Sequence, residues 1–180
     1  FLSELPRLFR KKVVPLDVVF IHVSPPDNHG YCSLGVSVEA TVAAIESAKT
    51  VIAQVNPNMP RTFGDGILHV SEIDFLVDVD CPIHEKEEEA ITPLEAKIGA
   101  HIASLIDDKS TLQLGIGSIP NAALANLMNH KDLGLHTEMF SDGVIDLILK
   151  DVINCNYKGV TRGRVLSTFM LGSKRLYDFV

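Results

Sequence analysis

The feature that most constrains the fold of this 180-residue chain is the alternation of short apolar runs with segments of helical periodicity. The apolar runs are rich in Val and Ile and are too short for helices, which favours buried strands. The segments between them place apolar residues three or four positions apart, as helices do. Strands that alternate with helices favour βαβ units and parallel pairing. The sequence therefore predicts an α/β fold with open, largely parallel sheets and flanking helices.

The expected strands cover residues 17–23, 50–55, 72–79, 111–114, 134–139 and 164–171. The expected helices cover residues 1–11, 37–49, 92–106, 120–129, 142–150 and the segment that begins at Ser173. In open α/β sheets, ligands bind beyond the carboxyl ends of the strands. A site is therefore expected at the loops that cover residues 56–66, 115–120 and 139–143.

A polar and acidic segment from Cys81 to Ile91 interrupts the hydrophobic periodicity, and its run Glu85 to Glu89 is expected to be a solvated face. Periodicity resumes at Thr92-Pro93-Leu94-Glu95, which is a capping box with Pro at the first helical position. We expect residues 1–85 to be the C-terminal part of a first α/β domain, and residues 92–180 to be the N-terminal part of a second. The chain begins without Met and stops within a helical pattern, so we expect an internal fragment.

Composition narrows the classes of partner. The net charge of -7 argues against nucleic acid, because nothing would neutralise the phosphates in bulk. Apolar runs stay well short of the ~20 residues that span a bilayer, so no membrane association is expected. Cys32, Cys81 and Cys155 are widely separated and form no C-x-x-C pair. This cysteine pattern fits a reducing compartment, the cytoplasm, better than a disulfide framework or a zinc site.

A glycine-rich turn, Gly115-Ile116-Gly117-Ser118-Ile119-Pro120, follows an expected strand and opens an expected helix. Its glycines let the backbone approach a ligand closely, and the helix start offers N–H groups to an anion or a developing oxyanion. Pro120 stands where the dinucleotide fingerprint has its third glycine, so the dinucleotide interpretation is weak. A tight strand–helix turn with Ser118 as the cap explains the pattern equally well. Spacing alone leaves both interpretations open.

Glu138 lies near the end of the strand expected in His136-Thr137-Glu138-Met139-Phe140-Ser141-Asp142-Gly143. With a period of two, His136 and Glu138 face the same side. The carboxylate could act as nucleophile, base or metal ligand, or form a salt bridge or cap. A metal site is the weakest option, since no third ligand stands at a supporting spacing. Gly115, Gly117 and Glu138 should lie at adjacent strand ends of one parallel sheet, because consecutive strand–helix units usually place their strands side by side.

Two further loops carry polar groups. The loop from Asn56 to Gly66 is stiffened by two prolines and contains one arginine, and the segment from Pro25 to Ser33 is similar in composition. Ordered surface loops would look the same.

These segments together resemble the acetyl-CoA hydrolase/transferase family, especially its 4-hydroxybutyrate and butyryl-CoA:acetate CoA-transferase members. The resemblance covers nearly the whole chain, in segments 27–35, 56–64, 115–121, 130–143 and 174–179. It is the combination of the glycine turn with the His-Thr-Glu segment about twenty residues later that is specific. Members of this family are more than twice as long.

The resemblance implies that Glu138 is the acyl-accepting nucleophile and that Gly115, Ile116, Gly117, Ser118 and Ile119 bind CoA. It implies ping-pong transfer of CoA from an acyl-CoA to a short-chain carboxylic acid through a glutamyl-CoA thioester. Coenzyme A would then be a substrate, with no tightly bound cofactor and no metal, and a homo-oligomer is expected. We further expect a wall of the acyl pocket to be formed by the long loop, with lining residues Asn56, Met59, Pro60, Thr62 and Gly64.

Three alternatives remain open. An acyl-CoA hydrolase would use the same glutamate and end its cycle with water. A non-catalytic α/β ligand-binding domain would need Glu138 to be buried in a structural ion pair. A nicotinamide oxidoreductase is disfavoured by Pro120 in the glycine turn.

Overall fold

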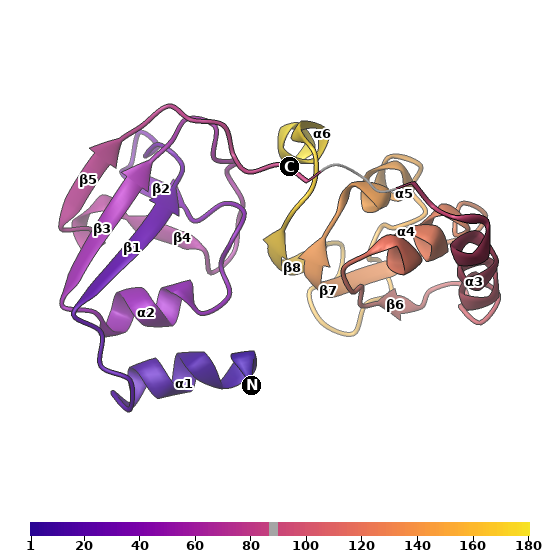
Figure 1. The fold of residues 1–180 in the computed structure, drawn as a ribbon, viewed down its shortest axis with the longest axis horizontal. Helices are drawn as coiled ribbons and strands as arrows, with labels where there is room; N and C mark the ends of the chain where they lie inside the picture. The colour runs from indigo at the N-terminus through magenta and orange to yellow at the C-terminus, as the bar shows by residue number, and fades with distance from the viewer. Residues whose placement is uncertain (87–89) are drawn as a thin grey trace. The chain divides into compact units, whose positions relative to one another are not determined.

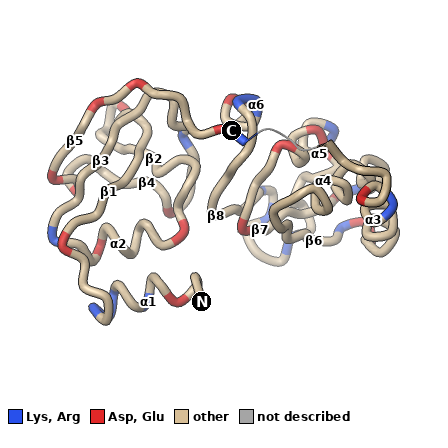
Figure 2. The backbone as a smooth tube through the Cα atoms, in the orientation of Figure 1, with Lys and Arg blue, Asp and Glu red and all other residues tan. Residues whose placement is uncertain are grey.

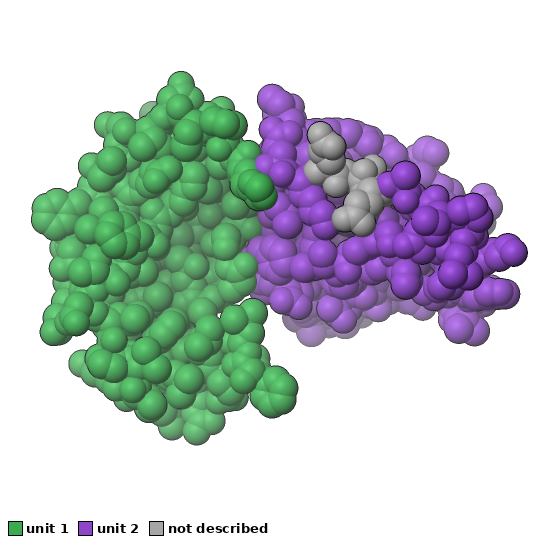
Figure 3. Space-filling model, viewed as in Figure 1, with its two compact units in different colours: residues 1–84, 180 green, residues 85–179 purple. Residues whose placement is uncertain are grey.

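The computed structural model describes residues 1–86 and 90–180. Residues 87–89, which belong to the acidic run predicted to be a solvated face, lie outside the described residues. The chain divides into two compact units, which Figure 3 distinguishes by colour. The first contains Phe1–His84 together with Val180, and the second contains Glu85–Phe179. Each is an α/β unit with a three-stranded parallel sheet, which confirms the predicted fold class.

The first unit contains a parallel sheet in the order β1-β3-β5 and an antiparallel pair, β2-β4 (Figure 1). Its strands are β1 Val18–Val23, β2 Tyr31–Ser33, β3 Thr50–Val55, β4 Ile67–His69 and β5 Phe75–Asp78. Its helices are η1 Leu2–Glu4, α1 Leu5–Arg10, α2 Thr41–Ser47 and η2 Val70–Glu72. The sequence predicted the three parallel strands but placed β2 inside a loop and did not predict β4.

The core of this unit follows the period of two in its strands. In β3, the buried residues Val51, Ala53 and Val55 alternate with partly exposed ones. Buried residues of β1, of the antiparallel pair and of the position just after β2 complete the cluster: Ile21, Val23, Cys32, Leu68 and Leu34. The carboxyl ends of β1 and β3 both lead directly into the two polar loops, at Ser24 and Asn56.

The second unit contains a parallel sheet in the order β6-β7-β8, with helices packed around it (Figure 1). Its strands are β6 Thr111–Leu112, β7 Gly134–Phe140 and β8 Leu166–Met170. Its helices are α3 Pro93–Ala103, α4 Ser118–Ala125, η3 Asp142–Val144, α5 Ile145–Leu149 and α6 Lys174–Phe179. Each of these elements was expected, although β6, β8, α3, α4 and α5 are shorter than predicted and α4 begins at Ser118 instead of Pro120.

Helix α3 begins at the predicted capping box. The Thr92 hydroxyl accepts the Glu95 N–H at 3.3 Å, and the Glu95 carboxylate accepts the Thr92 N–H at 2.8 Å. Farther along α3, Gly99 lies against α4, where an added Cβ would be 2.4 Å from the backbone of Ala122. Such a distance is well inside van der Waals contact, so glycine is what allows the two helices to approach this closely.

A buried lysine joins the start of β7 to the segment that leads into β8. Lys158 is only 1% exposed, and its Nζ donates to the carbonyls of Leu135 at 2.9 Å and Arg164 at 2.7 Å. Its carbon chain covers Gly134, where an added Cβ would be 2.6 Å from the Lys158 Cγ. Two carbonyl acceptors offset part of the cost of removing the ammonium group from water.

Charged side chains of both signs are interspersed on each unit (Figure 2). Several ion pairs on the surface join mostly exposed groups: Arg10–Glu46, Lys49–Asp17, Lys174–Asp178 and Arg175–Asp146. Solvent screens exposed pairs of this kind strongly. The stability of each unit therefore comes mainly from its apolar core.

Candidate active site

The glycine turn follows β6, and Glu138 lies near the carboxyl end of β7, the adjacent strand of the same parallel sheet, as the sequence predicted. Strand β6 pairs with β7 in the register Thr111↔Gly134 and Leu112↔Leu135. Three residues beyond Leu112 the chain reaches Gly115, and three residues beyond Leu135 it reaches Glu138. The pairing therefore brings the start of the turn level with the glutamate.

The glycine turn begins α4 in a conformation that requires glycine. Gly117 is the residue that precedes the helix, and it has φ +126° and ψ −178°. This is a positive-φ conformation that a residue with a Cβ adopts only under strain. Open space surrounds Gly117, with no atom within 4 Å of the position that a Cβ would take. A ligand can therefore approach the backbone at Gly117 closely. There it would meet the N–H groups of the first turn of α4, which helix hydrogen bonds leave free.

Ser118 does not cap its own helix. It is the first residue of α4, and its hydroxyl donates to the carboxylate of Glu95 in α3. Of the two interpretations that the sequence left open, the one with Ser118 as the helix cap does not hold, because α4 already begins at Ser118 and Gly117 is the residue that precedes it. The hydrogen bond from Ser118, followed by those from Thr92, lowers the pKa of Glu95 to about 2. Glu95 is thus an anion at neutral pH and is shared between the starts of two helices.

Glu138 lies on the exposed face of β7. The strand alternates, with His136 and Glu138 exposed and Thr137 and Met139 buried, which confirms that the histidine and the glutamate share a face. Among the residues that the structure describes, none forms a hydrogen bond or ion pair with the Glu138 carboxylate. Within the described residues, Glu138 therefore forms no buried structural ion pair, which the non-catalytic alternative required.

The backbone of Glu138 is held from β8. Its carbonyl accepts the hydroxyl of Ser167 at 2.9 Å and the hydroxyl of Thr168 at 3.0 Å. The Glu138 carbonyl thus accepts two side-chain hydroxyls. In a regular parallel ladder, the neighbouring strand would offer this carbonyl a single backbone N–H instead. Neither residue was predicted from the sequence, because a Ser-Thr pair in a strand gives no distinctive signal.

Thr137 joins β7 to the residue that precedes the glycine turn. Its Oγ1 accepts the Leu114 N–H at 2.9 Å and lies 3.1 Å from the Leu114 carbonyl, to which it donates. Thr137 is 4% exposed and Leu114 is 9% exposed. The sequence singled out Thr137 only as part of the segment around Glu138, because a side-chain contact with Leu114 cannot be deduced from spacing.

A small pocket lies between the glycine turn and the carboxyl end of β7. Its lining includes Gly115 to Ser118 from the turn, Met139 and Ser141 from the end of β7, and Gly172. Glu138, whose side chain lies on the other face of the strand, is not among the lining residues. Asp142, a buried residue that also lines the pocket, accepts the backbone N–H and the hydroxyl of Ser173, at 2.8 and 2.6 Å, and so fixes the start of α6.

The predicted substrate-pocket residues lie in the first unit, in the loop after β3. The Asn56 amide is fully buried and donates to the Cys81 carbonyl at 2.8 Å, while its oxygen accepts the Asn58 N–H at 3.1 Å. Met59 is buried beneath Gly35. The polar atoms of Asn56 are thus used within the loop and the chain beside it.

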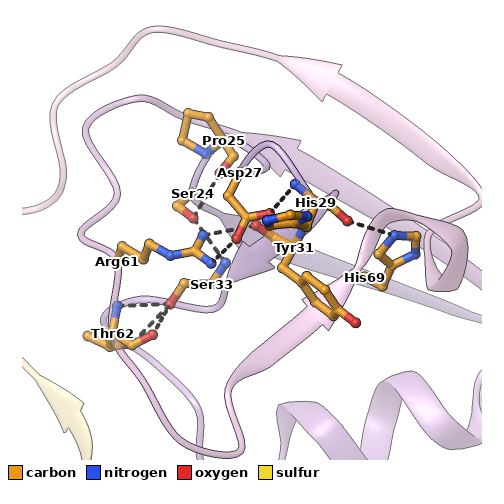
Figure 4. A network of polar contacts seen from close by, with 9 residues as sticks. All are labelled: Ser24, Pro25, Asp27, His29, Tyr31, Ser33, Arg61, Thr62 and His69. Atoms are coloured by element: carbon orange, nitrogen blue, oxygen red, sulfur yellow. Dashed lines mark hydrogen bonds and ion pairs between the residues drawn. The ribbon is translucent and has the colours of Figure 1, made fainter.

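The rest of this loop is tied to the loop after β1, as Figure 4 shows. Thr62 donates its N–H to the Ser33 hydroxyl at 3.0 Å and its own hydroxyl to the Gly35 carbonyl at 3.0 Å. Pro60 is partly exposed, and Gly64 is exposed with φ +98°. The Thr62 hydroxyl, like the Asn56 amide, therefore holds the loop in shape.

An ion pair makes the second connection between these two loops (Figure 4). Arg61 binds Asp27 with an Nη2–Oδ2 distance of 2.7 Å and donates from Nη1 to the Tyr31 carbonyl at 2.9 Å. The other Asp27 oxygen accepts the N–H groups of His29 and Tyr31, both at 2.9 Å. Hydrogen bonds from the backbone, with a smaller contribution from Arg61, lower the pKa of Asp27. The two loops, which are far apart in the sequence, are one cross-linked structure.

Metal ligands and membrane spans are both absent from the part of the chain that the structure describes. No three His, Cys, Asp or Glu side chains within residues 1–86 and 90–180 gather in a way that could bind a metal ion. Nor does any helix in these ranges combine the length and the apolar character needed to cross a membrane.

Comparison with known proteins assigns the chain to a family. Residues 1–91 match the acetyl-CoA hydrolase/transferase N-terminal domain. The chain belongs to the acetyl-CoA hydrolase/transferase family, as the sequence motifs indicated. Over its full length it is 52% identical to a 4-hydroxybutyrate coenzyme A transferase of Clostridium kluyveri, of which it covers 42%. It is 48% identical to a succinyl-CoA:acetate/propanoyl-CoA:succinate CoA transferase of Fasciola hepatica, of which it covers 38%.

Solved structures give the same assignment. A 4-hydroxybutyrate CoA-transferase from Porphyromonas gingivalis superimposes with a TM-score of 0.95 at 48% identity, over 99% of this chain and 46% of that one. RipA from Yersinia pestis gives a TM-score of 0.93 at 35% identity, over 99% of this chain and 42% of its own. The chain thus spans about two fifths of the length of the curated relatives it matches.

Proposed function

We propose that the protein to which this chain belongs is a CoA-transferase that moves CoA between an acyl-CoA and a short-chain carboxylic acid, with Glu138 as its nucleophile. The observation that carries the proposal is the Glu138 carboxylate, exposed and without a partner among the described residues, on the strand next to the glycine turn. The named activities of relatives 44–52% identical over the whole chain give it further support.

The first half-reaction would load CoA onto the enzyme. A Glu138 oxygen attacks the thioester carbonyl carbon, and the C–S bond breaks to give an acyl-glutamyl anhydride and CoA thiolate. The thiolate then attacks the glutamyl carbonyl, which releases the first acid as its carboxylate and leaves a glutamyl-CoA thioester. The second half-reaction runs the same steps in reverse with the incoming acid. No net oxidation or proton transfer is needed, so a carboxylate nucleophile is sufficient.

The glycine turn would bind CoA and stabilise the negative charge that develops on the carbonyl oxygen. The turn has open space at Gly117 and N–H groups at the start of α4, and the residues that would bind CoA are Gly115, Ile116, Gly117, Ser118 and Ile119. Loss of one oxyanion donor typically costs about 10²–10³ in rate. The acid would be recognised by the loop after β3, where the side chains of Asn56, Met59 and Thr62 act by holding the loop in shape while Pro60 and Gly64 lie at its surface.

We also propose the wider setting of the enzyme. Residues 1–85 would be the C-terminal part of a first domain and residues 92–180 the N-terminal part of a second, in agreement with the division into Phe1–His84 and Glu85–Phe179. Three free cysteines suit a reducing compartment, for which we propose the cytoplasm. The whole protein would be a homo-oligomer, which light scattering of the full-length protein would test.

The test is to trap Glu138 during turnover in the full-length protein. Acyl-CoA followed by borohydride should modify a peptide that contains Glu138, because borohydride reduces a glutamyl thioester to an alcohol. Glu138→Gln should abolish both labelling and CoA transfer to acetate while the protein stays folded. Glu39→Gln, which changes an exposed glutamate in the first unit, is the matched control and should behave as wild type. A label on another residue, or full activity of Glu138→Gln, would refute the proposal.

Hydrolysis is the second candidate, because the matching family includes acetyl-CoA hydrolases and the Glu138 carboxylate is open to solvent in this chain. In a hydrolase, water would release the acid or the CoA from the acylated glutamate. The two activities are separated by measuring free CoA release with and without acetate. A CoA-transferase should form acetyl-CoA when acetate is present and release little free CoA.

A further inference from the structure

We propose that Thr137 is a positioning residue that sets the glycine turn at the correct distance from Glu138. This inference rests on the proposed function of Glu138 as the nucleophile. It adds a buried residue that joins the strand of Glu138 to the glycine turn and so fixes where these two parts of the site lie relative to each other.

The backbone pairing between β6 and β7 is very short. It consists of Thr111↔Gly134 and Leu112↔Leu135, and β6 ends there. Beyond this point, the side chain of Thr137 links the two segments. Its hydroxyl accepts the Leu114 N–H at 2.9 Å and donates to the Leu114 carbonyl at 3.1 Å. A side chain thus replaces the backbone ladder just before the glycine turn.

The position of this link couples the two parts of the proposed site. Leu114 is the covalent neighbour of Gly115, and Thr137 is the covalent neighbour of Glu138. Consecutive Cα atoms are about 3.8 Å apart, so a bond between Leu114 and Thr137 restrains the turn and the glutamate at close range. Because side chains alternate along a strand, Thr137 is buried while Glu138 remains exposed to react.

The chemistry of threonine suits this role. A hydroxyl both donates and accepts, so one side chain can satisfy both backbone groups of Leu114. The β-branch also restricts rotation about χ1, which keeps the hydroxyl in one place. Valine has the same shape but no hydroxyl, and it would leave the nearly buried N–H and carbonyl of Leu114 without this partner.

A purely structural role would lower stability without a specific effect on the chemical step. The two roles can be separated with Thr137→Ala and Thr137→Ser in the full-length protein, since both lack the methyl group and differ only in the hydroxyl. Thr137→Val tests the hydroxyl at constant shape. Cys155→Ala is the matched control, because the Cys155 thiol is buried and accepts a backbone N–H of the same strand, that of Leu135 at 3.4 Å, at the end away from Glu138.

Three quantities should be measured for each variant: kcat for CoA transfer, the single-turnover rate of borohydride-trapped labelling at Glu138, and the unfolding midpoint. Displacement of a reacting group by about 1 Å costs on the order of 10² in rate. We therefore expect Thr137→Ala and Thr137→Val to lose on the order of 10² in both rates at temperatures where they are fully folded. Thr137→Ser should recover most of that loss, and Cys155→Ala should lower the midpoint with little change in either rate.

Equal rates for Thr137→Ala and Thr137→Ser would overturn the inference. It would also be overturned if Cys155→Ala, at equal stability, lost as much of the transfer and labelling rates as Thr137→Ala. If Thr137→Val does not fold, the alanine–serine comparison still decides. Failure of the proposed function is recognised separately, because in that case wild-type protein carries no label at Glu138. A labelled Glu138 with an unaffected Thr137→Ala would contradict only the role of Thr137.

Discussion

The carboxylate of Glu95, in the first turn of α3, accepts the hydroxyl of Ser118, the first residue of α4. Glu95 also accepts the N–H and the hydroxyl of Thr92, at 2.8 and 2.7 Å. One carboxylate therefore restrains the start of its own helix and the start of the helix that follows the glycine turn. The restraint depends on the charge of Glu95, because all of these partners donate.

Acid should remove this restraint. The pKa of Glu95 is lowered from 4.5 to about 2 in the folded protein, so its stabilising effect is complete above the unfolded value and is lost as pH falls toward 2. Glu95→Gln should be less stable than wild type near neutral pH, and the difference should shrink as pH falls through this window. Unfolding midpoints of both proteins across this pH range would test this. A difference that stays constant down to the acid limit would contradict it, and Glu39→Gln provides the control.

Gly117→Ala should strain the glycine turn without a steric clash. Gly117 has φ +126° and open space where a Cβ would stand, so the cost comes from the backbone conformation alone. We expect a loss of about 1–3 kcal/mol in the free energy of unfolding, together with weaker CoA binding. Gly159→Ala is the control, because Gly159 is exposed, its Cβ would also stand in open space, and its φ is not positive. Urea unfolding and CoA titration would measure both effects, and equal costs for the two variants would refute the argument.

Ser167 and Thr168 should act as mutual substitutes. Both hydroxyls reach the Glu138 carbonyl, and the Ser167 hydroxyl also lies 2.9 Å from the Phe169 carbonyl, although it has only one proton to donate. Loss of one donor therefore leaves the other in place. We expect Ser167→Ala and Thr168→Val each to cost little, and the double variant to cost about 1 kcal/mol more than their sum. A double-mutant cycle of unfolding free energies measures this term, and additive costs would show that the two donors are independent.

Lys158→Met should destabilise the second unit, although methionine fills a similar volume. Its buried ammonium group donates to the carbonyls of Leu135 and Arg164, and methionine would leave both without that donor. A buried unsatisfied acceptor typically costs about 1–3 kcal/mol. Denaturant unfolding should show such a loss for Lys158→Met and almost none for the exposed control Lys150→Met. Equal stability of the two variants would show that the carbonyls find other partners.

The sequence predicted those parts of the fold that depend on neighbours along the chain. The bounds of β3, Thr50–Val55, agree with the prediction because a run of alternating apolar residues ends at Asn56-Pro57. The capping box at Thr92 and Glu95 was predicted because its chemistry is local. The common face of His136 and Glu138 followed from the period of two.

The rest depends on contacts between distant residues. Strand β2 was placed in a loop because its three residues pair with β4 more than thirty positions away, and no local pattern encodes that pairing. The bond from Ser118 to Glu95 spans 23 residues, as does the bond between Leu114 and Thr137. Strand β6 was predicted to reach Leu114, but its ladder stops at Leu112 because the Thr137 side chain takes over.

The cross-links between the loops after β1 and β3 limit how these segments can change. Asp27 is paired with Arg61, and Ser33 is bonded to Thr62, so each loop supplies the partners that the other needs. In a chimera that receives only one of these loops from a relative, the residues of the retained loop would face a loop that did not evolve with them. Each of the two pairs would then depend on residues from different proteins. The two loops should therefore be exchanged together and with β4, the ladder partner of β2, so protein engineers who wish to alter this surface should treat residues 24–35 and 56–69 as one transplantable cassette.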